Sequence, residues 1–566
     1  MVTILTRLDD LEQLFGKSLP RDPAKLDELL YSVKCEVTNT TTTIADGAEL
    51  QLENKDTNRP DTWSTEGIAR ALRGYQGLEL GIRKYRAKSV AVHIAVDREL
   101  ADIRPFICCS VIRNLKINDA IIREIVQLQE KLDQSYGRNR RRSSIGLYDF
   151  DLITPPLRYG VADPDELRFI PLEWTEPLTL REILERHPKG IEYAHLVKQF
   201  SKMPILLDSK GKVLSFPPII NSNDLGRITP ETRNILIEIT GTSQQTVSWA
   251  LTILTTCLAD RGGEICSATI NYPYGKVRKI STPNLAERLV GIRLDDIRSL
   301  IGLKLARSEV VRLLRLARFD VQNASSSRLL VRVPCYRIDI MHPVDIMEDV
   351  AIAYGLNNFE PRWPSDQTVG GLTSIEDFSD TVRELMVGLG FQEILGFIMS
   401  NHEKLYGKMN REAGRPVEIS NPKVTTMTCL RSWLLPTLME VLSNNTHVEY
   451  PQKLFEVGDH VDWDDPAPTR TRDIRGLACV VAHSKSNFTE MKANLEPLMT
   501  NLGFNFTVKP IEHPSFLTGR VGSIQIHDEE VGIIGEVSPQ VIENWKIQNP
   551  VAAMELELDK LFRMRD

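Results

Sequence analysis

The sequence LSFPPIINSNDLGRITPETRNILIEITG, from Leu214 to Gly241, ends in a segment where isoleucine alternates with other residues. The isoleucines at positions 235, 237 and 239 fall on one face of an extended chain. The opposite face carries Leu236, Glu238 and Thr240. The paired prolines Pro217 and Pro218 and the polar turn NSND precede this segment, as is typical where a chain reverses direction. The pattern predicts a strand with one apolar face, and it singles out Glu238.

Glu238 has two interpretations. Burying an unpaired carboxylate is costly, so a buried face would need a partner for it. Periodicity alone favours the simpler interpretation, in which this face of the strand is open to solvent. In the alternative, the Glu238 side chain faces a polar pocket. The segment by itself leaves both open.

The segments around this strand predict a strand-rich domain over residues 89–272. SVAVHIAV (89–96) and FICCSVI (106–112) are typical of buried strands. Downstream, apolar residues at positions 247, 250, 251, 254 and 258 recur at helical spacing, and Gly262 follows the expected helix end.

Three further domains are predicted, because a chain of 566 residues is too long for one hydrophobic core. Residues 1–88 predict a small α+β domain, with Asp22 and Pro23 at the start of its helix. Residues 273–362 contain helical patterns and the extended segment LLVRVPCY. Residues 363–566 mix helices with strands. The expected fold class is α+β and multidomain.

Composition and charge exclude several classes of protein. There is no apolar run long enough to span a membrane, and charged residues at positions 7, 9, 10 and 12 are unlike a signal peptide. The eight cysteines are scattered, as in reduced, buried thiols. A net charge of −7 argues against coating DNA or RNA through bulk electrostatics. We expect a cytoplasmic protein that binds neither membranes nor DNA.

One basic run stands out, Arg138, Arg140, Arg141 and Arg142 in GRNRRRSSIG. A run of this kind is more often a solvated loop than a contact surface. The sequence leaves open whether these arginines meet a nucleic acid, a protein or water.

The segment RIDIMHPVDIMEDVAIAYGLNNF holds four carboxylates, at Asp339, Asp345, Glu348 and Asp349. Pro343 and Asp345 predict a helix start, with Glu348 and Asp349 three and four positions further along. Acidic residues in a first turn often only complement the helix dipole. Converging oxygen ligands would also suit Mg²⁺.

Several longer motifs resemble the phenylalanyl-tRNA synthetase β subunit family, in its archaeal and eukaryotic (cytosolic) form. They include GRNRRRSSIGLYDFDLITPPLRY, HPKGIEYAHL, PILLDSKGKVLSFPPIIN and TRNILIEITGT. The resemblance implies an editing domain that hydrolyses tyrosine wrongly attached to phenylalanine tRNA. The family's pocket residues correspond to Leu206, Ser215, Arg227, Glu238 and Thr240. Many archaeal relatives have Asp where this chain has Glu238.

The resemblance extends to LRSWLLPTLMEVLSNN, KLFEVGDHV, HPSFLTGRVGSI, IIGEVSPQVIENW and VAAMELELDKL. It implies mixed-sheet N-terminal and editing domains, a helical or winged helix-turn-helix-like domain with a structural Mg²⁺ at the four carboxylates, and a degenerate class II synthetase-like antiparallel sheet. The second and third signature motifs lack the arginines that would hold ATP. ATP would therefore be bound by a catalytic α subunit, in an (αβ)2 heterotetramer that charges phenylalanine tRNA.

Within the editing pocket, we expect Glu238 to bind the tyrosine hydroxyl and Arg227 to steer the tRNA end. Ser215 and Thr240 would then place the ester and a water molecule. No Ser/His/Asp arrangement lies near this stretch, which favours a positioned water over a covalent intermediate. Two alternatives are a non-enzymatic tRNA-binding or assembly subunit with a decayed pocket, and a free-standing trans-editing hydrolase.

Overall fold

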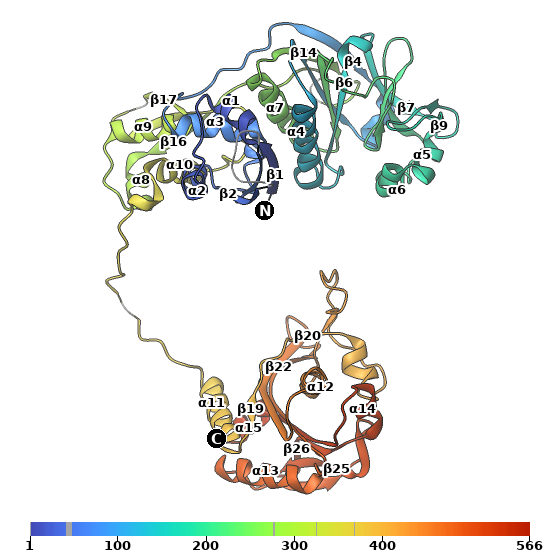
Figure 1. The fold of residues 1–566 in the computed structure, drawn as a ribbon, viewed down its shortest axis with the longest axis vertical. Coiled ribbons are helices and arrows are strands. Elements are labelled where there is room, and N and C mark those ends of the chain that lie inside the picture. Colours follow the sequence, from blue (N-terminus) through green and yellow to red (C-terminus); the bar gives the residue numbers. More distant parts are fainter. Residues whose placement is uncertain (1, 41–47, 276–277, 324, 367, 566) are drawn as a thin grey trace. The chain divides into compact units, whose positions relative to one another are not determined.

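The computed structural model describes residues 2–40, 48–275, 278–323, 325–366 and 368–565, which divide into two compact units (Figure 1). The first unit ends at Arg362 and the second begins at Trp363. Within the described ranges, no helix has the length and apolarity that crossing a bilayer requires.

The first unit begins with a three-stranded sheet in the order β1-β3-β2. All its strand pairs are antiparallel, whereas a mixed sheet was expected here. Asp22 caps the second helix by accepting a hydrogen bond from the Lys25 amide, as predicted. The elements are β1 (Val2–Arg7), α1 (Leu8–Phe15), α2 (Pro23–Tyr31), β2 (Cys35–Thr40), β3 (Glu49–Asn54) and α3 (Thr65–Tyr75).

A ten-stranded sheet follows, in the order β12-β11-β10-β7-β4-β14-β5-β13-β6, with β15 paired to β14. It is mixed, as predicted, because β4 runs parallel to both β14 and β7 while the other pairs are antiparallel. Its strands are β4 (Val90–Val96), β5 (Phe106–Arg113), β6 (Ser143–Asp149), β7 (Leu157–Ala162), β10 (Met203–Leu207), β11 (Val213–Phe216), β12 (Ile220–Asn221), β13 (Ile235–Gly241), β14 (Glu264–Asn271) and β15 (Lys279–Thr282).

Helices α4 (Asp119–Lys131) and α7 (Gln244–Asp260) cover one face of this sheet (Figure 1). The isoleucines of β13 pack against them, while Leu236 belongs to the core on the opposite face. The predicted alternation is therefore confirmed. A smaller lobe contains the hairpin β8 (Arg168–Phe169) and β9 (Leu178–Thr179), followed by α5 (Leu180–Arg186) and α6 (Pro188–Tyr193).

Buried charges join the helices of the N-terminal three-stranded sheet to those of the ten-stranded sheet. Arg261 follows α7, and its guanidinium contacts three carboxylates on other helices: Asp10 on α1, Glu66 on α3 and Glu124 on α4. Burial and the nearby Asp10 raise the pKa of Glu124 to about 8, against the lowering effect of Arg261. We call these four residues the Arg261 cluster.

The last part of the first unit is a three-stranded antiparallel sheet with helices packed on it. Pro343 opens the final helix, as predicted, and His342 caps it. The elements are β16 (Arg288–Arg293), α8 (Leu294–Ile301), α9 (Arg307–Leu316), β17 (Asp320–Asn323), β18 (Arg328–Val333) and α10 (Pro343–Tyr354).

The second unit is built on a seven-stranded sheet in the order β19-β22-β23-β27-β26-β25-β24. Only the pair β19–β22 is parallel among its described pairs, so the predicted antiparallel character holds for the rest. The strands are β19 (Gln392–Glu393), β22 (Gln452–Trp463), β23 (Thr471–Ala482), β24 (Thr507–Pro510), β25 (Phe516–Ile526), β26 (Glu529–Val537) and β27 (Val551–Glu557).

Alternating residues of β23 feed two cores, one on each face of this sheet. Helices α11 (Ser374–Gly388), α13 (Phe488–Asn501) and α15 (Leu558–Met564) pack on one core. Helices α12 (Leu435–Asn444) and α14 (Pro539–Asn544) pack on the other, near the small pair β20 (Met399–Ser400) and β21 (Cys429–Leu430).

Candidate active site

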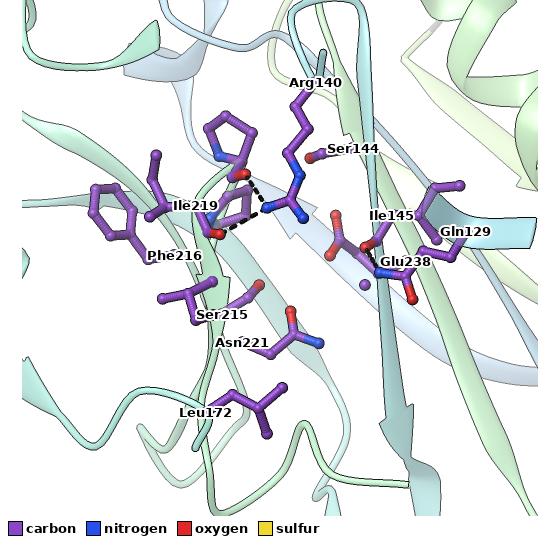
Figure 2. Close-up of a pocket in the computed structure, with 14 residues that line it drawn as sticks. Gln129, Arg140, Ser144, Ile145, Leu172, Ser215, Phe216, Ile219, Asn221 and Glu238 are labelled. Atoms are coloured by element: carbon purple, nitrogen blue, oxygen red, sulfur yellow. Dashed lines mark hydrogen bonds between the residues drawn. The ribbon is translucent and has the colours of Figure 1, made fainter. Parts of the chain in front are cut away.

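A cavity of about 90 Å³ lies in the large sheet of the first unit, between β6 and β13 on one side and the turn from β11 to β12 on the other (Figure 2). The cavity is lined by apolar residues, among them those of the β11–β12 turn, and by polar side chains. The polar lining residues are Gln129, Arg140, Ser144, Ser215, Asn221 and Glu238.

Glu238 is buried, with 2% of its surface exposed, which contradicts the interpretation of a solvated strand face. Its Oε2 accepts a hydrogen bond of 2.9 Å from the hydroxyl of Tyr148. Its Oε1 makes no hydrogen bond with any residue that the structure describes. Burial raises the pKa of Glu238 to about 7, although the Tyr148 bond, the charge of Arg104 and the nearby Thr240 hydroxyl act to lower it. One oxygen of the carboxyl group, Oε2, is therefore bonded to Tyr148, and the other, Oε1, can accept a further hydrogen bond.

Gly146 makes room for this carboxylate. It lies on β6 directly opposite Glu238 in the strand register. A Cβ atom at position 146 would come within 2.2 Å of the Tyr148 hydroxyl and 2.7 Å of Glu238 Oε2. Such distances are far below van der Waals contact, so only glycine leaves the Tyr148–Glu238 pair in place.

Ser215 and Leu206 face each other across the β10–β11 pair. The Ser215 hydroxyl is buried on the cavity wall and forms no hydrogen bond with the described residues. Burial raises the pKa of Tyr148 well above its ordinary value, and the nearby Ser215 hydroxyl opposes that rise. Leu206 lies behind it in the apolar core with Leu236. Leu206 therefore supports the wall and is not part of the lining.

Thr240 acts from behind the cavity through a buried arginine that the sequence did not single out. Arg104 donates from Nε to Thr240 Oγ1 (3.0 Å) and from Nη2 to Ser144 Oγ (3.0 Å). Ser144 lines the cavity, so Thr240 is connected to the cavity through Ser144. Arg104 sits alone in the segment ADIRPF, where no pattern marks it as buried.

Arg227 lies apart from the other predicted pocket residues. Its side chain is exposed in the segment after β12, and it does not line the cavity. The structure thus brings Ser215 and Glu238 together on the lining, places Thr240 and Leu206 just behind it, and leaves Arg227 outside.

Arg140 corrects the interpretation of the basic run as a solvated loop. Its side chain is only 16% exposed and lies on the cavity wall, whereas Arg138, Arg141 and Arg142 are exposed. Its Nε lies 3.3 Å from Asp133 Oδ2. Burial raises the pKa of Asp133 to about 7, and the arginine charge opposes that rise.

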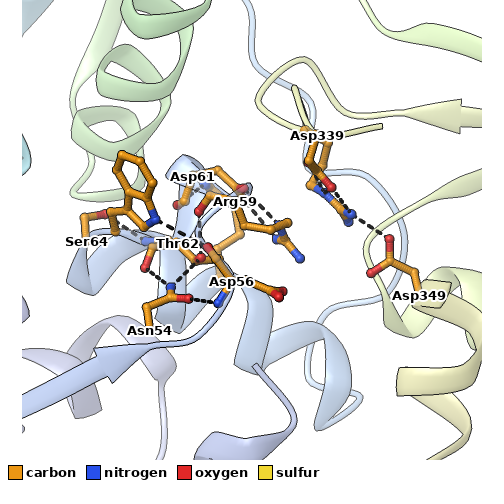
Figure 3. Close-up of polar contacts among 12 residues, drawn as sticks. Asn54, Asp56, Arg59, Asp61, Thr62, Ser64, Asp339 and Asp349 are labelled. Atoms are coloured by element: carbon orange, nitrogen blue, oxygen red, sulfur yellow. Dashed lines mark hydrogen bonds and ion pairs between the residues drawn. The ribbon is translucent and has the colours of Figure 1, made fainter. Parts of the chain in front are cut away.

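The four carboxylates predicted to hold Mg²⁺ do not converge. Asp339 and Asp349 are both bound by Nη2 of Arg337, at 2.7 and 2.5 Å (Figure 3). Both oxygens of Asp339 are used in this way, and the guanidinium lowers the pKa of Asp339 although burial alone would raise it. Burial wins at Asp349, whose pKa is raised.

The other two carboxylates are engaged elsewhere. Asp345 Oδ2 accepts hydrogen bonds from the amides of Met341 and His342, which caps α10. Glu348 forms an ion pair of 2.7 Å with Lys34. Over the described ranges, no group of three or more His, Cys, Asp or Glu side chains is placed to hold a metal ion. In this arrangement the residues do not fit a magnesium site.

In the second unit, the buried Arg431 pairs with Glu456 of β22 at 2.8 Å. Glu555 of β27 accepts hydrogen bonds from the amides of Leu434 and Leu435 at the start of α12. Arg431, Glu456 and Glu555 are therefore paired with other groups of the second unit. The absence of ATP chemistry from this unit stays a prediction.

Comparison with known proteins supplies the context for this geometry. The tRNA synthetase B5 domain matches residues 290–356, and the phenylalanyl tRNA synthetase beta chain CLM domain matches residues 360–558. The phenylalanine–tRNA ligase beta subunit of Pyrococcus horikoshii is 43% identical over 554 residues, covering 98% of each chain. That of Methanocaldococcus jannaschii is 37% identical over 568 residues, covering 99% of this chain and 100% of its own.

A solved structure matches the first unit. It is an N-terminal fragment of the phenylalanyl-tRNA synthetase beta subunit from Pyrococcus horikoshii, 41% identical, with a TM-score of 0.60. The match covers 62% of this chain and 99% of that fragment.

Proposed function

This chain belongs to the phenylalanine–tRNA ligase beta subunit family, and we propose that its buried cavity hydrolyses tyrosine wrongly attached to phenylalanine tRNA. An apolar synthetic site shaped for phenylalanine rejects a ligand that adds only a hydroxyl by roughly a hundredfold. Translation needs better discrimination, so a second site that recognises the hydroxyl is required.

The observation that supports this proposal most is the free oxygen of Glu238. Buried acceptors without a donor are costly, and Glu238 Oε1 has no donor among the described residues. A tyrosyl side chain in the cavity would supply its hydroxyl as that donor. A phenylalanyl side chain would leave the oxygen unpaired, so the same group that attracts tyrosine disfavours phenylalanine.

The remaining roles follow from position. Ser215 lies on the lining with an unpaired hydroxyl and would orient the ester or the attacking water. Thr240 would hold Ser144 in place directly, with 3.2 Å between the two hydroxyl oxygens, and through Arg104. Because the lining residues include neither His nor Cys, a positioned water is favoured over a covalent intermediate. Arg227, exposed outside the cavity, would meet the tRNA end.

The proposal extends to the partner and the setting. We place the chain in the cytoplasm, in an (αβ)2 complex with a catalytic α subunit that binds ATP and attaches phenylalanine to its tRNA. The hydrolytic step then belongs to this chain and the synthetic step to the partner. No step is assigned to Mg²⁺, since the four carboxylates are committed to other contacts.

The test is co-expression with a candidate α subunit, followed by assays of phenylalanine charging and of Tyr-tRNA hydrolysis. Glu238→Ala should abolish selective Tyr-tRNA hydrolysis and keep charging. Glu130→Ala removes an exposed carboxylate from α4 and serves as the matched control. Unchanged hydrolysis and unchanged tyrosine selectivity in Glu238→Ala would sink the assignment. A wild-type complex that charges but never deacylates would indicate a decayed pocket, and a monomer that deacylates alone would indicate a free-standing hydrolase.

A further inference from the structure

Arg140 is held in the cavity by an unusual stretch of backbone. Helix α4 continues into a wide turn, Leu132–Tyr136, with π-helical hydrogen bonding. The next residues, Arg138, Asn139 and Arg140, have φ values of 52°, 51° and 63°. Left-handed backbone costs roughly 1–2 kcal/mol for an arginine, and such strain is concentrated at functional sites. The strained turn directs one member of the basic run inward.

Once inside, the guanidinium is fixed on several sides. Nη1 donates to the carbonyl oxygens of Pro218 and Ile219, at 3.1 and 2.8 Å. Nε faces Asp133, and the ring of Tyr193 lies 4.4 Å from the guanidinium carbon. The orientation of this cation is therefore set before any ligand enters.

Two donor groups of Arg140 make no hydrogen bond with the described residues, and of these only Nε has an ion-pair partner, Asp133. Its Nη2 makes no hydrogen bond with the described residues, and Figure 2 shows the guanidinium reaching into the space between the β11–β12 turn and Glu238. The contacts to carbonyls, carboxylate and ring explain how the arginine is held. They do not use the amino group that faces the cavity.

We propose that Arg140 donates this hydrogen bond to the carbonyl oxygen of the scissile ester and stabilises the negative charge that develops there. The inference rests on the hydrolytic function proposed above. A donor fixed in advance and partly shielded from water is the arrangement that stabilises an oxyanion best, because it does not need to reorganise during the reaction.

The step balances without a further reactant. Water oxygen forms a bond to the ester carbonyl carbon, and the carbonyl electron pair moves onto the oxygen that faces Arg140. When that pair returns, the bond to the ribose oxygen breaks, and the departing oxygen takes the proton that the water gave up. The products are free tyrosine and uncharged tRNA.

The decisive variants are Arg140→Gln and Arg140→Lys, assayed in the complex with the α subunit. Glutamine removes the charge, and lysine keeps it without the planar fork needed to hold the two carbonyls and reach the ester together. We expect kcat for Tyr-tRNA hydrolysis to fall by about a hundredfold or more in both variants, with KM little changed and phenylalanine charging retained. Arg141→Gln, at an exposed position of the same run, should keep wild-type hydrolysis.

Chemical rescue separates this role from a purely structural one. Added methylguanidinium should restore part of kcat in Arg140→Gln, which a collapsed pocket would not permit. Hydrolysis within a few-fold of wild type in Arg140→Gln, a loss confined to KM, or a loss without rescue would overturn the inference while leaving the proposed function standing. A wild-type complex without Tyr-tRNA hydrolysis would overturn both.

Discussion

Replacing Glu238 with glutamine tests the energetics of the buried carboxyl group. Glutamine keeps the shape and the acceptor for Tyr148 but has no proton to lose. In the folded protein burial raises the pKa of Glu238 to about 7, whereas an unfolded chain leaves it near the ordinary value of 4.5. The folded state therefore binds this proton more tightly than the unfolded state does.

The sign and size of the effect follow from linkage. Because the folded pKa is raised, the stabilisation is present at low pH and is lost as the pH rises towards the folded pKa. For a shift of this size, the wild-type free energy of unfolding should fall by about 2 to 3 kcal/mol between about pH 5 and about pH 8 from this group alone. Glu238→Gln lacks that loss, so its stability relative to wild type should rise by the same amount over that interval.

Urea unfolding of a chain ending at Arg362 measures this difference at each pH. The crystallised fragment of the Pyrococcus relative, which matches 62% of this chain, supports working with the first unit alone. Asp133 adds a similar pH dependence to both proteins, so it cancels in the difference to first order. Glu130→Gln is the exposed control and should track wild type. A difference between Glu238→Gln and wild type that does not change with pH would refute the reasoning.

Three shorter predictions concern other parts of the first unit. Gly146→Ala should nearly abolish Tyr-tRNA hydrolysis and leave phenylalanine charging by the complex intact, because the new Cβ would displace Tyr148 and Glu238. Normal hydrolysis by this variant would contradict the close packing. Arg261→Ala leaves the three carboxylates of the Arg261 cluster without their guanidinium, and should lower the free energy of unfolding in urea by roughly 3–5 kcal/mol. Thermal unfolding of the first unit should have the same midpoint in Mg²⁺ and in a chelator, since its candidate ligands are engaged in protein contacts; stabilisation by Mg²⁺ would show that they rearrange.

The sequence predicted the strand faces of β13 because the period of two is a local property of the chain. It could not predict whether the face with Glu238 meets water or protein. That outcome depends on β6 and on the β11–β12 turn, which lie elsewhere in the chain and close over the carboxyl group. Gly146 is needed for the same reason, and only the register between β6 and β13 reveals it.

Arg140 shows a second limit of local patterns. In the sequence it is one of four arginines in five positions, and composition assigns the same solvated role to all of them. The atoms that hold it belong to residues 78 and 79 positions away, and to Asp133 within a turn whose π-helical form has no signature in the sequence. Burial of a charge is decided by its partners, and distant partners are invisible to a local pattern.

The acidic helix start shows a related limit: the four carboxylates proposed as Mg²⁺ ligands are engaged in protein contacts in this structure. Spacing placed Glu348 and Asp349 one turn after Asp345, and α10 confirms that they share a helix. Sharing a helix does not bring carboxylates to one point, because each can turn to a nearer donor. Arg337 lies two positions before Asp339 and satisfies both that residue and Asp349. A cation would have to displace a guanidinium that already neutralises the pair, and burial makes that exchange costly unless the arginine gains a new partner at the same time.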